Sequence, residues 1–322
     1  MHYLELENEY AKFIGTQHCV TVNTGTAALH VALEALELPK GSKVIVPDFT
    51  MYASALAVYY ARLQPVFVDC DENLLIDLEK VEKVIDENTK VLMITHIYGR
   101  TVDMKKVMSL AKKYNLRVIE DACEAQGASQ GGKMIGSFDI GCFSFYMNKI
   151  IHGEEGGAIT TNDTLLAEKI RDMKSMSFGT THNYYHEKIG FNYRMTNSQA
   201  KMILESLRNY KNNIVRRKEI ADIFNSLFPD KYKMPNNRDV VWVYDLKHQN
   251  AEKLTYALKQ NSINARHSFK PMSSMPLFPD HQIGKISSKK SKEVFYLHID
   301  LNWSNEDVTE VFKKTYKLME QM

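Results

Sequence analysis

The alternation of short apolar runs with amphipathic stretches constrains the fold of this chain more than any other feature. Strand-like runs are expected at residues 19–22, 44–46, 66–68, 91–95 and 118–119. Helices are expected between them, at 26–36, 52–61, 78–85 and 104–114. This order is typical of a mostly parallel sheet covered by helices on both faces. Two more strand-like runs, at 142–145 and 158–161, follow each other without a long helix, so the sheet is expected to be mixed.

The remainder of the chain predicts a second, smaller unit. A helix at 4–13 opens the sequence, and from residue 197 the apolar spacing lengthens into one helix that runs to residue 224. Such a helix is long enough to bridge two domains. Three further elements are expected, a strand and two helices, at 240–246, 252–260 and 305–319. Because a chain of 322 residues commonly forms two domains, we assign residues 1–205 to a large domain and 206–322 to a smaller C-terminal domain.

Charge and composition exclude several classes of protein. Lys and Arg number 41 and Asp and Glu 39, so the net charge is +2 and lacks the basic excess of nucleic-acid-binding proteins. The basic run at 285–292 is expected to be a solvated loop. The four cysteines form no CxxC pair, so we expect reduced thiols in a cytoplasmic protein. We expect no membrane partner, because a leader is lacking and no apolar run approaches the roughly 18 residues of a membrane span.

Three segments place chemically useful groups at predicted strand ends, where ligands bind in open α/β sheets. The sequence NTGTAAL reads as a turn from strand to helix, whose N–H groups form a phosphate cradle at Gly25 and Thr26. Asp121 ends a β-branched strand, and Lys149 follows a short aromatic strand. Alone, Asp121 could cap a helix and Lys149 could reach the surface.

A phosphate cradle, an acid and a strand-end lysine, in this chain order, fit pyridoxal 5′-phosphate (PLP) better than any other cofactor. The lysine would form the Schiff base, the acid would hydrogen-bond the pyridinium nitrogen, and the glycine turn would hold the phosphate. His182 and His186 stand four residues apart, but no third ligand is in sight, so no metal site is expected.

The chain also resembles the sugar aminotransferases of the DegT/DnrJ/EryC/StrS family. The matching segments run in family order from residue 23 to 200: NTGTAALHVAL, VIVPDFTMYASA, PVFVDCD, HIYG, VIEDACEAQGA, GSFDIGCFSFYMNKIIHGEEGGAITTND and IGFNYRMTNSQA. A weaker likeness continues through DVVWVYDL and INARHSFKPMSSMPLF. The resemblance implies the type I aminotransferase fold, an α/β fold with a mostly parallel mixed sheet flanked by helices in a large domain, and a smaller C-terminal α+β domain.

The resemblance also implies roles for single residues. PLP would be held by Gly25, Thr26, Asp121, Glu124, Ser144 and Lys149, with Lys149 as the catalytic residue. Glu124 would lie close to the cofactor ring, and Ser144 would be a second phosphate ligand. The alternatives are a surface helix glutamate for Glu124 and a strand hydroxyl bonded to a neighbour for Ser144.

Asn192 resembles the asparagine that, in this family, reaches the phosphate of the neighbouring subunit. This implies a homodimer whose two active sites are shared. A turn-forming asparagine beside Gly190 is the alternative. Tyr193 and Arg194 are further candidates for contact with the substrate's phosphates, and His186 is a candidate for the sugar pocket.

The sequence departs from the family pattern at two places. Relatives carry an aromatic residue directly after the threonine of a PDFT-like segment, where it stacks on the pyridine ring. Here Met51 holds that place and Tyr52 follows, so either side chain is expected to cover the ring. Relatives also have a longer N-terminal lead, including a substrate-contacting segment, whereas this chain starts almost inside the first helix. A catalytically silent relative, acting as a binding or regulatory subunit, therefore stays open as an alternative.

The activity that the resemblance implies is transfer of an amino group from glutamate to a nucleotide-linked keto sugar, through pyridoxamine phosphate. Asn148 and Lys149, followed by GEEGG, resemble the subgroup that aminates carbon 4 of 4-keto-6-deoxy sugars. The likeness through PDFT, EDACEAQG and CFSF is to the enzymes that convert GDP-4-keto-6-deoxymannose to GDP-perosamine. A UDP- or dTDP-linked 4-keto-6-deoxyglucose is the alternative substrate.

Overall fold

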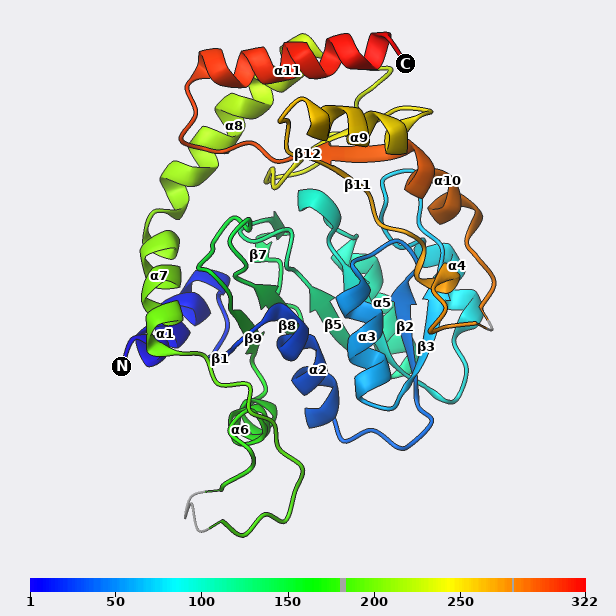
Figure 1. Ribbon diagram of the computed structural model, residues 1–322. Coiled ribbons are helices and arrows are strands. Elements are labelled where there is room, and N and C mark those ends of the chain that lie inside the picture. The colour runs from blue at the N-terminus through cyan, green and yellow to red at the C-terminus, as the bar shows by residue number, and fades with distance from the viewer. Residues whose placement is uncertain (180–183, 280) are drawn as a thin grey trace.

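The computed structural model describes residues 1–179, 184–279 and 281–322, and a seven-stranded sheet forms its centre (Figure 1). The order across this sheet is β1 (His18–Val22), β9 (Gly157–Thr161), β8 (Ile140–Ser144), β5 (Arg117–Asp121), β4 (Thr89–Thr95), β2 (Lys43–Pro47) and β3 (Gln64–Val68). Strand β9 runs antiparallel to both of its neighbours, and the other neighbouring pairs are parallel. The expected mixed, mostly parallel sheet is therefore confirmed.

Helices cover both faces of the sheet because successive side chains of a strand point to opposite sides. Ile45 and Val46, neighbours in β2, belong to two different buried clusters. The cluster of Val46 is covered by α2 (Gly25–Ala35), α3 (Tyr52–Tyr60) and α6 (Thr164–Met173). The cluster of Ile45 is covered by α1 (His2–Ile14), α4 (Leu78–Val84), α5 (Met104–Tyr114) and α7 (Asn197–Arg208). A hairpin of β6 (Ser129–Gln130) and β7 (Lys133–Met134) lies outside the main sheet.

The long helix expected from residue 197 is two helices. Helix α7 ends at Arg208, and α8 (Tyr210–Leu227) begins after Asn209, whose φ of −89° and ψ of 4° lie outside the helical range. The expectation of one continuous helix is therefore wrong. The break lets α8 leave the sheet in a new direction, toward the upper part of the molecule in Figure 1.

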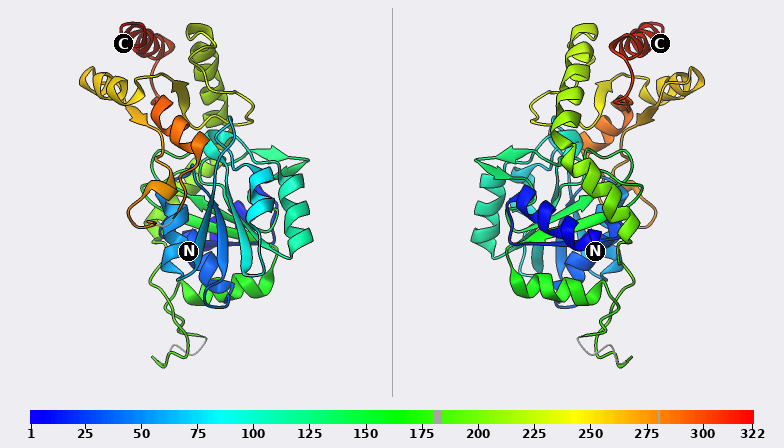
Figure 2. Two further views of the ribbon diagram at one scale, coloured as in Figure 1. Left: turned by 90° about the vertical axis from the view of Figure 1, so that its right-hand side faces the viewer. Right: turned by 90° about the vertical axis from the view of Figure 1, so that its left-hand side faces the viewer.

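The C-terminal part has a core of its own. Its sheet is antiparallel, in the order β10 (Tyr244–Lys247), β12 (Val294–Leu297) and β11 (Ala265–His267). It packs with α8, α9 (Ala251–Gln260) and α11 (Asn305–Glu320) around buried residues such as Phe224 and Phe312. Figure 2 shows this unit standing above the large sheet. The exact boundary between residues 205 and 206 stays a prediction.

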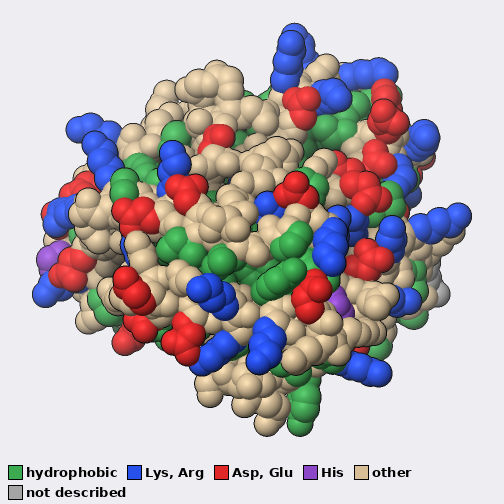
Figure 3. Space-filling view, turned by 90° about the horizontal axis from the view of Figure 1, so that it is seen from above, with side chains coloured by type: hydrophobic (Ala, Val, Ile, Leu, Met, Phe, Trp, Pro, Cys, Tyr) green, Lys and Arg blue, Asp and Glu red, His purple; other side chains and the backbone are tan. Residues whose placement is uncertain are grey.

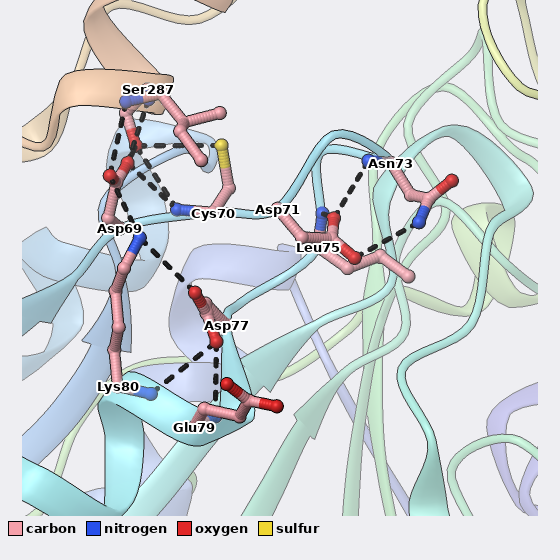
Figure 4. Close-up of polar contacts among 10 residues, drawn as sticks. Asp69, Cys70, Asp71, Asn73, Leu75, Asp77, Glu79, Lys80 and Ser287 are labelled. Atoms are coloured by element: carbon pink, nitrogen blue, oxygen red, sulfur yellow. Dashed lines mark hydrogen bonds and ion pairs between the residues drawn. The ribbon is translucent and has the colours of Figure 1, made fainter.

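Two acids that follow β2 and β3 anchor the segment that connects β11 to β12. Asp69 accepts hydrogen bonds from the Ser287 amide (2.8 Å), the Ser287 hydroxyl (2.6 Å) and the Ile286 amide (3.1 Å), as Figure 4 shows in part. Burial acts to raise the pKa of the Asp69 carboxyl, but these hydrogen bonds outweigh it and hold the pKa below its ordinary value. Asp48 likewise accepts from the amides of Ser273 and Gly284.

The same contacts correct one expectation about the basic run. Residues Lys285–Glu293 form α10, not a solvated loop, and Asp69 binds its first amides. Lys290 is only 6% exposed and pairs with Glu72. The helix forms because a carboxylate at its N-terminus satisfies N–H groups that have no partner within the helix.

The surface mixes charges of both signs. On the face seen from above, Lys and Arg side chains are interspersed with Asp and Glu (Figure 3). Within the described residues, no helix combines the length and apolar character needed to cross a membrane. All four cysteines are free thiols, and three of them, Cys19, Cys70 and Cys142, are buried.

Candidate active site

The predicted site residues converge at the carboxyl ends of the central strands. Asp121 is the last residue of β5, Ser144 is the last residue of β8, and Thr24 is the N-cap of α2, directly after β1. A cavity of about 340 Å³, which we call the lysine cavity, opens at this edge. Seven of the residues expected to contact a cofactor line it: Gly25, Thr26, Met51, Asp121, Glu124, Ser144 and Lys149.

The turn before α2 is shaped to receive an anion. The Thr24 hydroxyl accepts a hydrogen bond from the Ala27 amide at 3.0 Å and so fixes the start of the helix. The first amides of a helix have no partner within it and point at the space beyond its N-terminus. Gly25 packs directly on β8, because a Cβ added to it would lie 2.7 Å from the Ser144 Cβ. A side chain at residue 25 would therefore fill the cradle.

Asp121 is buried and held in one orientation. Its side chain accepts a hydrogen bond from the Ser54 hydroxyl at 2.7 Å and a longer one from the Cys123 amide at 3.3 Å. Ser54 in turn contacts Thr50, so a row of hydroxyls supports the carboxylate from α3. Ser54 was not predicted, because its contact with Asp121 joins residues that are distant in the chain.

Lys149 lies between an acid and an aromatic ring. The lysine is 9% exposed, and its Nζ is 3.9 Å from the Glu124 Oε1 and 3.9 Å from the centre of the Trp242 ring. Aromatic faces attract cations at such distances. The Trp242 Nε1 donates to the Asn148 carbonyl at 2.7 Å, which fixes the ring beside the lysine.

The pKa of Glu124 is shifted by its surroundings. Burial raises its pKa to about 7, against the opposing effects of Lys149 and of the Tyr98 amide, which donates to Glu124 Oε2 at 3.1 Å. Near neutral pH this carboxyl is thus divided between its protonated and ionised forms. A group in that condition can donate or accept a proton beside Lys149.

A second cavity of about 840 Å³ adjoins the first, and we call it the α8 cavity. Five residues line both cavities: Tyr146, Asn148, Lys149, Trp242 and Arg266. Its other walls include Asn209, Arg217 on α8 and His298. Sequence reasoning did not assign roles to Trp242, Arg217 or Arg266. Trp242 and Arg266 lie in the segments of weaker family likeness, DVVWVYDL and INARHSF, and this was the only sequence signal for them. Arg217 lies outside both segments and had no such signal.

Comparison with known proteins agrees with this geometry. The profile of the DegT/DnrJ/EryC1/StrS aminotransferase family matches residues 2–315. The chain belongs to this family. GDP-perosamine synthase of Escherichia coli O157:H7 is 38% identical over 285 residues, which are 86% of this chain and 78% of that protein.

Two further comparisons show the range within the family. A UDP-N-acetyl-3-dehydro-alpha-D-glucosamine 3-aminotransferase of Acidithiobacillus ferrooxidans is 42% identical over 198 residues, 61% of this chain and 53% of that protein. The crystal structure of S. venezuelae DesV in complex with a ketimine intermediate has a TM-score of 0.91 and 28% identity, and the match covers 100% of this chain and 90% of that one. The expected fold and the assignment to an enzyme family are confirmed.

The departure from the family pattern at residue 51 has a geometric counterpart. Met51 lines the lysine cavity and is 52% exposed, whereas Tyr52 does not line it. The Tyr52 ring instead faces Phe278, with 6.5 Å between ring centres. Of the two candidates, only Met51 is placed at the cavity, and its contact with a cofactor ring stays a prediction.

Besides Tyr52, four expected site residues do not reach either cavity of their own chain. Asn192 and Arg194 are exposed, and Asn192 forms a β-bridge with Ser175. The Tyr193 hydroxyl is 2.9 Å from the His30 Nδ1, so it is engaged away from the cavity. His186 is exposed, and its Nδ1 lies 2.9 Å from the Met176 carbonyl oxygen. Contacts of these residues with substrate or cofactor stay predictions, and they would require a second copy of the chain.

The expected absence of a metal concerned His182 and His186. His182 lies outside the described residues. Among those that the structure describes, no group of three or more His, Cys, Asp or Glu side chains is arranged to hold a metal ion.

Proposed function

We propose that this chain transfers an amino group from glutamate to carbon 4 of GDP-4-keto-6-deoxymannose, which gives GDP-perosamine. The observation that carries the proposal is the convergence of seven predicted residues on the lysine cavity. The 38% identity to GDP-perosamine synthase over 86% of the chain supports this substrate.

The residues of the lysine cavity fit PLP. The N-terminus of α2 with Ser144 would hold the phosphate, since Gly25 leaves room there for an anion. Asp121, buried and fixed by Ser54, would keep the pyridine nitrogen protonated. When bound, PLP supplies an electron sink for the substrate carbon. Met51 would close one side of the site.

Lys149 is the group proposed to move protons at the substrate. Its Nζ is held beside Glu124 and under Trp242, at the junction of the two cavities. A lysine can act as a base only when it is neutral. Glu124, whose pKa of about 7 lets it exchange a proton near neutral pH, is the neighbour that would accept or return that proton.

We further propose that two copies of the chain form a dimer with shared sites. Asn192, Tyr193 and Arg194 are placed outside their own cavities, and two of them are exposed. These residues are therefore available to a neighbouring copy. In that arrangement Asn192 would contact the cofactor phosphate of the partner.

Two alternatives are weighed against this proposal, and a specific observation supports the first of them. A UDP- or dTDP-linked sugar is the first, because relatives that act on UDP sugars also match this chain, for example at 42% identity over 198 residues. That relative is a 3-aminotransferase, so amination at carbon 3 belongs to the same test. A catalytically silent subunit is the second, and the retained Lys149 and Asp121 argue against it.

Direct assay separates these possibilities. The protein is incubated with PLP, glutamate and, one at a time, GDP-, UDP- and dTDP-linked 4-keto-6-deoxy sugars and a 3-keto nucleotide sugar. Products are identified by mass and NMR. We expect GDP-perosamine. Amination at carbon 3, or turnover of UDP or dTDP sugars alone, would contradict the proposed substrate and position of amination. No turnover at all would favour the catalytically silent subunit.

A further inference from the structure

Arg217 is a buried cation that forms no ion pair with a carboxylate of residues 1–179, 184–279 or 281–322. It is 7% exposed, and its Nη1 donates to the carbonyl oxygens of Trp242 (2.8 Å) and Val241 (3.4 Å). Its Nε is buried and has no hydrogen-bond partner in the described part of the chain. Burial lowers the pKa of Arg217, and the opposing group is the Tyr244 hydroxyl rather than an acid. A buried charge without a counterion is unfavourable unless something else neutralises it.

The other buried arginines of this region do have an acid. Arg100 and Arg238 share Asp245, at 2.7 Å and 2.9 Å. The side chains of both arginines are at most 4% exposed. Arg100 and Arg238 are thus neutralised by an acid of the protein itself. Arg217 differs from them, and a bound anion could neutralise it.

Arg217 faces the α8 cavity, next to other positive groups. Arg266 lines both cavities, is exposed, and forms no ion pair with any described residue. His298, another wall residue, has its pKa lowered to about 4 by burial and then by the charges of Arg266, Lys149 and Arg217. At neutral pH this histidine is thus uncharged; burial is the main cause of its lowered pKa, and the three positive charges add to it. Glu154, Glu205 and Asp300 also line the cavity, all three exposed, and none lies within 4 Å of either arginine.

We propose that the α8 cavity binds an oxyanion of the substrate, with Arg217 and Arg266 as its cationic ligands. Planar guanidinium groups suit phosphate and carboxylate oxygens. The inference rests on the proposed function for its two candidate anions, the diphosphate of a nucleotide sugar and a carboxylate of glutamate. The volume of 840 Å³ lies in the upper part of the range of ligand pockets and accommodates a nucleoside diphosphate.

The test is calorimetric titration of the PLP-loaded protein with GDP, pyrophosphate and glutamate in separate experiments. Loaded protein is used so that the phosphate cradle at Gly25 is already filled. The variants are Arg217→Gln, Arg266→Gln and, as a matched control, Lys218→Gln, which removes an exposed positive charge from the residue next to Arg217. We expect each arginine variant to weaken GDP and pyrophosphate binding by about tenfold or more, and Lys218→Gln to stay within about twofold.

The outcomes are distinct. If the arginine variants weaken only glutamate binding, the site is an oxyanion site for the amino donor. Unchanged binding of all three probes in Arg266→Gln and in folded Arg217→Gln overturns the proposal, and so does a parent protein that binds none of them. Circular dichroism checks the fold; if Arg217→Gln does not fold, Arg266→Gln decides. Arginine-dependent GDP binding without turnover of any keto sugar would overturn the proposed function and keep the oxyanion site.

Discussion

The two cavities that meet at Lys149 are built in different ways. The lysine cavity is walled mainly by strand ends and turns of the large sheet, and its acid, Asp121, is already hydrogen-bonded by Ser54. The α8 cavity is more than twice as large, and its walls come mainly from the helices and strands after residue 197. Its buried cation, Arg217, forms no ion pair with any acid in the part of the chain that the structure describes.

The difference indicates a division of labour. A site whose polar groups are satisfied within the protein is rigid before any ligand arrives. A site with an unpaired buried charge is completed only by its ligand, and it discriminates strongly against molecules that cannot supply the missing partner. We infer that the lysine cavity holds the cofactor, which is the same for every substrate, and that the α8 cavity determines which substrate binds.

Replacing the residue that the two cavities share should have the largest effect. Lys149→Ala is expected to lower turnover by about 10³-fold or more, because it removes the group that moves protons. It should also abolish the yellow colour of the PLP-loaded protein, which borohydride bleaches in the parent. Absorption spectra and single-turnover assays measure both effects. Lys112→Ala, an exposed lysine on α5, is the control and should stay yellow and active. A parent protein that is colourless and takes up no PLP would contradict the cofactor proposal.

The second prediction is that the stability of the protein depends on pH through Glu124, which lines the lysine cavity and not the α8 cavity. Glu124 has a pKa of about 7 in the folded protein against an ordinary value of 4.5, so the folded state holds its proton more tightly than the unfolded state. The cofactor-free protein should therefore lose stability as pH rises through this window, by up to about 3 kcal/mol. Glu124→Gln should remove most of that loss, as measured by urea unfolding at pH 5 and pH 8.

The control for this prediction lies in the other cavity. Glu205→Gln changes an exposed carboxyl of the α8 cavity and should leave the pH dependence of unfolding as it is in the parent. If the free energy of unfolding changed equally with pH in the parent and in Glu124→Gln, burial would not raise the pKa of Glu124 as described.

A third substitution should weaken ligand binding in the lysine cavity and leave binding in the α8 cavity unchanged. Gly25→Ala places a Cβ 2.7 Å from the Ser144 Cβ, so the turn or β8 must shift. Overpacking of this kind costs about 1–3 kcal/mol, and we expect PLP to bind about 10- to 100-fold more weakly. Spectrophotometric titration of the cofactor-free protein measures this. GDP binding to the α8 cavity should change by less than about twofold. An equal loss of both affinities would mean that the two cavities are not independent.

The smallest effect is expected from a residue outside both cavities. Asn192→Ala should weaken PLP retention by about fivefold, the equivalent of one hydrogen bond, if Asn192 contacts the phosphate of a partner. Sedimentation should show a dimer for the parent and the variant. Asn261→Ala, an exposed asparagine of the C-terminal unit, is the control. A monomer that retains PLP equally well with and without Asn192 would contradict the shared site.

The contrast between the cavities also explains what the sequence could predict. Asp121 and Lys149 were predictable because one ends a strand and the other follows one, and parallel strands bring their carboxyl ends to one edge whatever the rest of the chain does. The role of Ser144 came from the family resemblance. The βα alternation defined the sheet and most of its helices for the same local reason. Glu124 was placed by the family resemblance, but its raised pKa depends on burial that only the folded structure reveals.

Long-range contacts account for what was missed. Trp242 reaches Lys149 from just before β10, and Arg217 acquires its environment from segments that follow α8. The helix break at Asn209 has no Gly or Pro to announce it. The basic run of α10 was expected to be a loop because of its charges, and Asp69, the acid that binds the first amides of this helix, lies more than two hundred residues earlier in the chain. None of these contacts has a local sequence pattern.

The position of β9 has a consequence for how the molecule is made. Strand β1 lies at the edge of the sheet and pairs with β9, in a register that joins Val22 to Gly157. At about 5–20 residues per second, about 7 to 27 seconds of translation separate Val22 from Gly157. During that time the turn at Gly25 has no neighbouring strand to fix it. The phosphate cradle, although encoded first, is therefore completed only after β8 and β9 have been made.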